Sequence, residues 1–127
     1  MINDHTGWLR KLVIHNKRLY SCSYDTTVRV WNLTSLSCEQ TLQSPQRVES
    51  CCVWQDFVFV GSDDARMRVY VDGEADNAVI LKEHTLAVLA MIANDDIVVS
   101  GSYDGTLKVW GVLDVDVAAP EAEEPTD

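Results

Sequence analysis

One spacing occurs three times in this sequence: an Asp is followed six residues later by an aromatic residue that ends an apolar stretch. The three segments are Asp25–Trp31, Asp64–Tyr70 and Asp104–Trp110, and the Asp residues are offset by 39 and then 40 positions. A fixed period of this length indicates one supersecondary unit repeated along the chain. Because one such unit cannot bury its apolar faces alone, we expect each unit to pack against the next.

The repeats align closely. Three stretches of 21 residues, His5–Asp25, Ser44–Asp64 and His84–Asp104, match without a gap. Units of about 40–45 residues with a strand that ends on Trp are typical of propeller blades. The sequence therefore predicts an all-β fold of three four-stranded antiparallel blades. Positions that coincide when the three repeats are aligned are called columns below. The apolar columns include Leu9/Val48/Val88, Leu12/Cys51/Met91 and Ile14/Val53/Ala93.

The apolar runs and the polar turn residues between them predict where each strand begins and ends. We expect the blades at about 5–43, 44–83 and 84–117, and an acidic disordered tail at 118–127, because a tail rich in Glu and Pro without aromatics buries too little apolar surface to order itself. The predicted strands are 9–14, 18–23, 27–32 and 38–42, then 48–54, 57–61, 66–71 and 78–82, then 88–93, 97–102 and 106–111, with 113–117 as a possible last strand.

With its loop His, its Ser-x-Ser strand, its Asp turn and its Trp-ended strand, the sequence resembles the WD-repeat family over residues 4–113. The second repeat departs from the family pattern, with Ser44 in place of His, Val60 in place of Ser and Tyr70 in place of Trp. The resemblance implies a structural hydrogen-bond network that links His, Ser, Asp and Trp in the first and third repeats and is missing from the second. Its members would be His5, Ser21, Asp25 and Trp31, then His84, Ser100, Asp104 and Trp110.

The resemblance also implies a peptide-binding face, formed by the positions three and five after the loop His and one before the turn Asp. Trp, Tyr and Arg at these positions are the residue types enriched at binding hot spots. Two simpler roles stay open: Trp8 packs against a neighbouring blade, or Arg47 is only solvated. The ligand also stays open, since the Arg residues suit an acidic or phosphorylated peptide and the acidic residues suit a Lys or Arg. The expected partner-binding residues are Trp8, Arg10, Tyr24, Arg47, Glu49, Asp63, Leu89 and Tyr103.

Composition and motifs argue against several other functions. The net charge is −10, of which residues 114–127 contribute −6, so a nucleic-acid partner is not expected. No apolar run is long enough to predict a membrane span, and no metal, cofactor or catalytic motif is visible. We expect His15 to be solvated at a surface turn. The four Cys residues lack a C-x-x-C pair, and reduced, mostly buried thiols indicate a cytoplasmic or nuclear protein.

Three blades leave the ring of a propeller incomplete. Three explanations stay open: the chain is part of a larger propeller, it completes a ring with copies of itself, or it is an open array. A three-blade series taken alone leaves one face bare at each end, and the exposed residues are expected to include Leu9, Leu12 and Ile14 at one end and Leu107, Val109 and Trp110 at the other. The predicted function is a non-enzymatic scaffold that binds protein or peptide partners. The alternative is the substrate-recognition part of a ubiquitin ligase complex.

Overall fold

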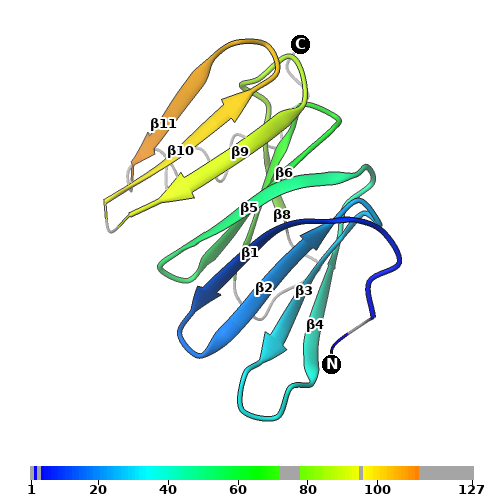
Figure 1. Cartoon of the computed structure of the whole chain (residues 1–127). Coiled ribbons are helices and arrows are strands. Elements are labelled where there is room, and N and C mark those ends of the chain that lie inside the picture. The colour runs from blue at the N-terminus through cyan, green and yellow to red at the C-terminus, as the bar shows by residue number, and fades with distance from the viewer. Residues whose placement is uncertain (1, 3, 72–77, 95, 112–127) are drawn as a thin grey trace.

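The computed structural model describes residues 2, 4–71, 78–94 and 96–111, and within them eleven strands form three antiparallel sheets (Figure 1). No α-helix occurs in these ranges, and the all-β prediction is confirmed. The first sheet, blade 1, contains β1 (Leu9–His15), β2 (Arg18–Ser23), β3 (Thr27–Asn32) and β4 (Cys38–Gln43). Blade 2 contains β5 (Val48–Trp54), β6 (Phe57–Ser62), β7 (Met67–Val71) and β8 (Ala78–Leu81), and blade 3 contains β9 (Val88–Ala93), β10 (Ile97–Ser102) and β11 (Leu107–Gly111).

Each blade is a simple meander in which consecutive strands pair with one another. The predicted strand limits agree with the observed limits to within one residue: β1 extends one residue further, to His15, and β7 begins one residue later, at Met67. The first strands, β1, β5 and β9, follow one another along the middle of the molecule (Figure 1). The possible last strand at 113–117 and the tail at 118–127 lie outside the described residues.

The turn after the second strand is built in the same way in all three blades. The residue after the turn Asp has a positive φ in each case, 78° at Thr26, 70° at Ala65 and 87° at Gly105. The Asp carboxylate then accepts a hydrogen bond from the backbone two residues on, as Asp side chains do in tight turns. The Asp of the repeated spacing therefore fixes the chain reversal from which the third strand starts.

The blades are joined by apolar junctions between facing sheets. Blade 1 presents β2 and β3 side chains to blade 2, including Tyr20 and Val28, and blade 2 presents Cys51 and Tyr70 in return. All of these side chains are almost fully buried. The whole first junction consists of Tyr20, Cys22, Val28, Val30 and Leu42 from blade 1 and Val48, Cys51, Val58, Val60 and Tyr70 from blade 2.

The second junction uses the same columns one repeat later. Blade 2 contributes Phe59, Met67 and Val69, and blade 3 contributes Met91 and Trp110. Trp110 and Tyr70 share a column, and both pack on the preceding blade. The expectation that Trp110 is exposed at the end of the chain is therefore wrong: this column faces backward along the series of blades, and Trp110 is buried against blade 2.

Among the residues that the structure describes, no blade packs on the outer face of blade 1 or of blade 3. Leu12 of β1 is 58% exposed, whereas Cys51 and Met91 in the same column are 0% and 2% exposed. At the other end Leu107 is 74% exposed, whereas Val28 and Met67 in its column are 0% and 1% exposed. The expected exposure of Leu9, Ile14 and Val109 is likewise observed.

All four cysteines are present as free thiols. Cys22, Cys51 and Cys52 are buried in the blade junctions, and Cys38 is half-buried. A hydrogen bond with Cys22, together with burial, raises the pKa of Cys51 well above its usual value, and burial raises the pKa of Cys52 to about 12. Cys51 and Cys52 are therefore neutral, apolar packing groups at physiological pH.

The part of the chain that the structure describes contains no helix with the length and apolar character needed to cross a membrane.

Candidate functional site

In blade 1 a chain of hydrogen bonds connects the β3 aromatic to the turn Asp. The Trp31 indole N–H donates to Ser21 Oγ over 2.8 Å, and Ser21 Oγ lies 2.6 Å from His5 Nε2. His5 Nδ1 lies 2.8 Å from a carboxylate oxygen of Asp25. The pattern is satisfied when Nδ1 carries the ring proton and donates it to Asp25, so that Nε2 accepts from the Ser21 hydroxyl.

Within this hydrogen-bond network, the Asp25 carboxylate accepts the largest number of hydrogen bonds. Burial acts to raise its pKa, but hydrogen bonds from the Thr27 hydroxyl, from His5 and from the Thr6 backbone outweigh burial and hold the pKa at about 2. The Thr27 hydroxyl donates over 2.6 Å and the Thr6 N–H over 3.1 Å. Asp25 therefore ties the incoming loop to the turn between β2 and β3.

Blade 3 contains the same network, but its His-to-Asp distance is longer than in blade 1. Trp110 donates to Ser100 over 3.1 Å, and Ser100 Oγ lies 2.8 Å from His84 Nε2. His84 Nδ1 lies 3.1 Å from the Thr106 hydroxyl and 3.4 Å from Asp104. Hydrogen bonds from the Thr106 side chain and the Thr85 backbone hold the pKa of Asp104 well below its usual value.

Blade 2 lacks these groups and uses an ion pair in their place. The Arg68 guanidinium lies 2.7 Å from the Asp64 carboxylate and donates to Ser62 Oγ over 3.1 Å. Ser62 also donates to Asp64 over 2.6 Å. Burial acts to raise the pKa of Asp64, but Arg68 and Ser62 lower it below its usual value. Sequence reasoning missed Arg68, which aligns with the basic residues Arg29 and Lys108.

A Ser, His and Asp linked in this order also occur in hydrolases, but the geometry gives them a structural role. The Ser21 and Ser100 hydroxyls are almost completely buried and each is occupied by a Trp indole N–H, so neither is open to a substrate. Among the residues that the structure describes, no three His, Cys, Asp or Glu side chains converge as a metal site requires.

The loops held by these networks meet at one end of the blades, and the same backbone hydrogen bond joins them in every blade. The N–H before the turn Asp donates to the carbonyl three residues after the loop position. The bonds are Tyr24 to Trp8 at 2.9 Å, Asp63 to Arg47 at 3.0 Å and Tyr103 to Ala87 at 2.9 Å. Two of the three predicted binding columns are therefore neighbours in each blade.

The side chains of blade 1 form an aromatic and cationic cluster at this end. The Trp8 and Tyr24 rings stack with centroids 5.9 Å apart and an angle of 17° between their planes. The guanidinium carbons of Arg10 and Arg47 lie 5.2 Å and 4.9 Å from the Tyr24 ring centroid. Trp8 is 75% exposed, so it does not pack inside a blade junction. Arg47 comes from blade 2, and the cluster therefore bridges two blades.

Two carboxyl groups lie at the edge of the cluster. Glu49 is buried, lies 3.4 Å from Arg10 Nε and accepts a hydrogen bond from the Tyr24 hydroxyl over 3.3 Å. Burial raises the pKa of Glu49, and the neighbouring Asp63 raises it further. Arg10 is thus already paired with a carboxylate. Arg47, in contrast, has no carboxylate at ion-pair distance among the described residues.

The predicted residues of blade 3 lie apart from this cluster. Tyr103 is 74% exposed and Leu89 is also exposed. In the described ranges no ring contact, ion pair or side-chain hydrogen bond joins either residue to Trp8, Tyr24 or the two Arg residues. The structure thus brings together six of the eight predicted residues, Trp8, Arg10, Tyr24, Arg47, Glu49 and Asp63, and does not bring Leu89 or Tyr103 into this cluster.

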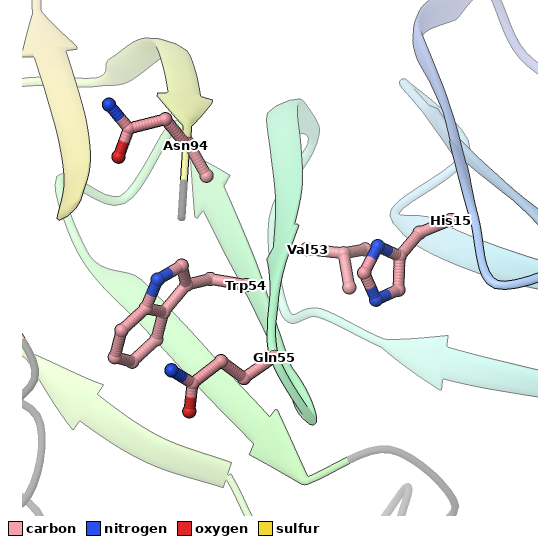
Figure 2. A pocket seen from close by; sticks show the side chains of 6 residues that line it. His15, Val53, Trp54, Gln55 and Asn94 are labelled. Carbon is pink, nitrogen blue, oxygen red and sulfur yellow. The ribbon is translucent and has the colours of Figure 1, made fainter. Parts of the chain in front are cut away.

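A hollow of about 460 Å³ lies at the opposite end of the blades. His15, at the end of β1, approaches Val53 from blade 1, and Trp54 and Asn94 lie on the other side of Val53 (Figure 2). The expectation that His15 is solvated at a turn is wrong, since His15 is the last residue of a strand and is half-buried in this hollow. No ion pair among its described lining residues gives the hollow a defined chemistry.

The repeats of this chain are similar in sequence to those of known proteins. A family model described as "WD domain, G-beta repeat" matches residues 1–32 and 77–111. F-box/WD repeat-containing protein 9 from Bos taurus is 30% identical over 111 residues, which are 85% of this chain and 24% of that protein. Mitochondrial division protein 1 from Schizosaccharomyces pombe is 27% identical over 118 residues, with 75% and 18% covered. The chain spans about a quarter or less of the length of these relatives.

Solved structures match the fold. The structure of U3-55K superposes with a TM-score of 0.80 at 15% identity, over 87% of this chain and 38% of that chain. The computationally designed Ika4 protein superposes with a TM-score of 0.72 at 26% identity, over 85% of this chain and 68% of that chain.

Proposed function

Because the chain belongs to the family of WD domain, G-beta repeats, whose members generally serve as scaffolds, we propose that it binds peptide segments of partner proteins. The binding surface is the cluster of Trp8, Arg10, Tyr24 and Arg47, called the Trp8 face below. Proteins of this family have a general role in protein interaction, and the proposal adds the place and the ligand.

The observation that carries the proposal is the exposed Trp8 ring. A Trp side chain that is 75% exposed is rarely left without a partner, because its large apolar surface gains more from burial than that of other residues. Trp8 is also held in one orientation by its stack on Tyr24, so little side-chain entropy is lost when a ligand covers it. Rigid, exposed aromatic residues of this kind are the usual centres of protein interfaces.

The charges of the Trp8 face favour an acidic or phosphorylated ligand. Arg10 is already paired with Glu49, whose carboxylate oxygen lies 3.4 Å from Arg10 Nε, so Arg10 is less available to a ligand. Arg47 is exposed and lacks a carboxylate partner among the described residues, so its guanidinium is available for a bidentate contact with a carboxylate or phosphate. We propose that an apolar ligand side chain covers Trp8 and that an anionic one pairs with Arg47.

Binding to a peptide library tests this proposal. Acidic, phosphorylated, neutral and basic peptides of equal length are measured by fluorescence polarisation against the purified chain. We expect acidic or phosphorylated peptides to bind best, and Trp8→Ala to weaken them by about thirtyfold, which corresponds to about 2 kcal/mol. Arg47→Gln should remove the preference for anionic peptides and leave weak binding of neutral ones.

Lys17→Ala is the matched control, because Lys17 is an exposed cation on the hairpin between β1 and β2, at the opposite end of blade 1. Circular dichroism shows whether each variant keeps its fold. Equal affinity of the folded Trp8→Ala/Arg47→Gln variant and the unchanged chain would exclude the Trp8 face as the binding surface.

A second candidate function is substrate recognition for a ubiquitin ligase. It is favoured by the similarity to F-box/WD repeat-containing protein 9, whose name joins these repeats to an F-box. In this case a protein captured through the Trp8 face should carry ubiquitin in cells treated with a proteasome inhibitor, and the ubiquitin signal should fall with Trp8→Ala. For a simple scaffold, the captured protein should show the same ubiquitin signal with and without the substitution.

A further inference from the structure

Glu49 is a buried acid at the edge of the Trp8 face that the contacts of a ligand with Trp8 and Arg47 do not use. It lies on β5 and is 7% exposed, and one of its carboxylate oxygens faces two groups of blade 1. Arg10 Nε lies 3.4 Å from this oxygen, and the Tyr24 hydroxyl donates to the same oxygen over 3.3 Å. A single acid of blade 2 therefore holds two of the side chains that form the Trp8 face.

The two Arg residues of the Trp8 face have similar positions and different partners. Both guanidinium carbons lie close to the Tyr24 ring centroid, that of Arg10 at 5.2 Å and that of Arg47 at 4.9 Å. Arg10 has Glu49 at ion-pair distance, whereas Arg47 has no carboxylate at that distance among the described residues. Because both cations lie against one ring, two anionic groups of a short peptide can reach them together. The Glu49 carboxylate competes with a ligand for the first of these two cations.

The surroundings of Glu49 favour the uptake of a proton. Burial raises the pKa of its carboxyl group, and Asp63, which hydrogen-bonds to it, raises the pKa further. Tyr24 and Arg10 lower the pKa, with smaller effects. The second cation of β1, Lys11, donates to a backbone carbonyl of β9 and not to Glu49. The β9 strand also packs against β5, and its side chains include no titratable group.

We propose that Glu49 determines how many anionic groups of a ligand the Trp8 face accepts. The ionised carboxylate occupies Arg10 and leaves Arg47 for one anionic group. When Glu49 takes up a proton, Arg10 is released and pairs with a second anionic group of the same peptide. The charge that remains on Asp63 is not at ion-pair distance from Arg10 within the described ranges. This inference rests on the proposed function, because it requires the Trp8 face to bind anionic peptides.

The direction of the pH effect follows from these contacts. An acid with a raised pKa takes up its proton at a higher pH than an ordinary carboxyl group does. The affinity for a ligand with two anionic groups should therefore increase as the pH falls, and the affinity for a ligand with one such group should change little. By linkage, an anion bound at Arg10 in turn favours the protonated form of Glu49.

Fluorescence polarisation with two labelled peptides tests the inference on the full chain. The peptides have equal length and the same apolar residues, and they carry either one or two cysteic acids, whose sulfonates stay ionised throughout the titration. At neutral pH we expect Glu49→Gln to bind the two-sulfonate peptide about tenfold more tightly than the unchanged chain does, because Arg10 gains a charged partner. The affinity for the one-sulfonate peptide should change by less than about twofold, since an added distant charge is largely screened.

A pH series separates the proton on Glu49 from other effects. Lowering the pH from about 8 to about 5 should bring the two-sulfonate affinity of the unchanged chain toward that of Glu49→Gln. The affinity of Glu49→Gln itself should change much less, because Gln carries no proton that titrates. Replacing Arg10 as well, in Glu49→Gln/Arg10→Gln, should remove the gain, because the released cation is then absent.

Glu39→Gln is the matched control. Glu39 on β4 lies 3.0 Å from Arg18 Nε, so this substitution makes the same change in net charge and also breaks a Glu–Arg pair. Arg18 follows the hairpin between β1 and β2, at the end of blade 1 opposite to the Trp8 face. We expect Glu39→Gln to bind both peptides as the unchanged chain does.

The outcomes separate this inference from the proposed function. Equal gains for Glu49→Gln and Glu39→Gln would mean that only net charge matters, and would overturn the inference. It would also fall if Glu49→Gln showed no gain, or if the two-sulfonate affinity of the unchanged chain did not depend on pH. In these cases, one-sulfonate binding that Trp8→Ala weakens would still support the proposed function. Absence of binding to both peptides in every variant would overturn the proposed function and the inference together.

Discussion

Arg68 and Asp64 form an ion pair, 2.7 Å long, at the position where blades 1 and 3 have a His, Ser and Trp network. Both side chains are mostly buried, and Ser62 hydrogen-bonds to both partners. Blade 2 therefore fixes its turn Asp by a charge from its own third strand, whereas the other blades fix theirs by a His from the incoming loop. One backbone geometry is thus maintained by two different sets of side chains.

Arg68→Met should destabilise the fold by about 3 kcal/mol, because it leaves the Asp64 carboxylate buried without its cation. Arg29→Met is the matched control, since Arg29 occupies the same column in blade 1 and has no carboxylate at ion-pair distance within the described ranges. We expect the control to cost less than about 1 kcal/mol. Urea unfolding at one fixed protein concentration measures both values, and equal losses for the two variants would contradict the role given to the pair.

Ser21→Ala should cost about 1–3 kcal/mol, because the Trp31 indole N–H loses its acceptor and His5 loses its donor in a buried site. Thermal unfolding followed by circular dichroism gives the loss. The control is Ser35→Ala, at an exposed loop serine, which should stay within about 0.5 kcal/mol of the unchanged protein. A Ser21→Ala variant as stable as this control would mean that the network does not stabilise blade 1.

Acid should weaken the fold partly through Asp25. Its pKa is about 2 in the folded chain and about 4 in an unfolded one, so its contribution to stability is complete above about pH 4 and is lost as the pH falls toward 2. Asp25→Asn removes this group from the titration. Urea unfolding from pH 6 to pH 2 should therefore show a smaller loss of stability for Asp25→Asn than for the unchanged protein, whereas parallel curves would mean that Asp25 has an ordinary pKa.

Ala65→Gly should stabilise the fold by about 0.5–1 kcal/mol. Ala65 has a φ of 70°, a conformation that costs L-residues about 1–2 kcal/mol and costs glycine little, and Gly105 already occupies the equivalent position in blade 3. Ala93→Gly in β9 is the control and should destabilise by about 0.5–1 kcal/mol, because a strand residue gains nothing from the added freedom. Thermal unfolding should shift in opposite directions for the two variants.

The strands were predictable because the sequence marks both of their ends. Polar turn residues separate the apolar runs, and the distance from Asp to the aromatic residue is the length of a turn and a strand. The predicted limits differ by one residue at some strand ends: β1 continues to His15, which pairs with Arg18, whereas β7 begins one residue later than predicted, at Met67. The network residues of blades 1 and 3 were predictable for the same reason, since each one has a fixed place relative to the turn.

The direction of side chains was harder to predict. Arg68 shares its column with Arg29 and Lys108, and nothing in its own neighbourhood indicates that it turns inward toward Asp64. The change follows from the loss of His at Ser44 and of Ser at Val60, which leaves Asp64 without the partners that the other turn residues have. The sequence predicted Trp110 at an open end because it does not indicate which face of a blade packs on the preceding blade and which on the following one. Such properties depend on packing between blades.

The backbone bond from Tyr24 N–H to the Trp8 carbonyl has a consequence for how the Trp8 face can diverge. The bond fixes both positions without using either side chain, and it recurs with Asp63 and Arg47 and with Tyr103 and Ala87. At these positions the backbone atoms therefore maintain the fold, and the side chains are left to determine which ligand binds. The two side chains of each hydrogen-bonded pair can therefore be substituted together, which changes the ligand specificity of the blade and leaves its backbone structure unchanged.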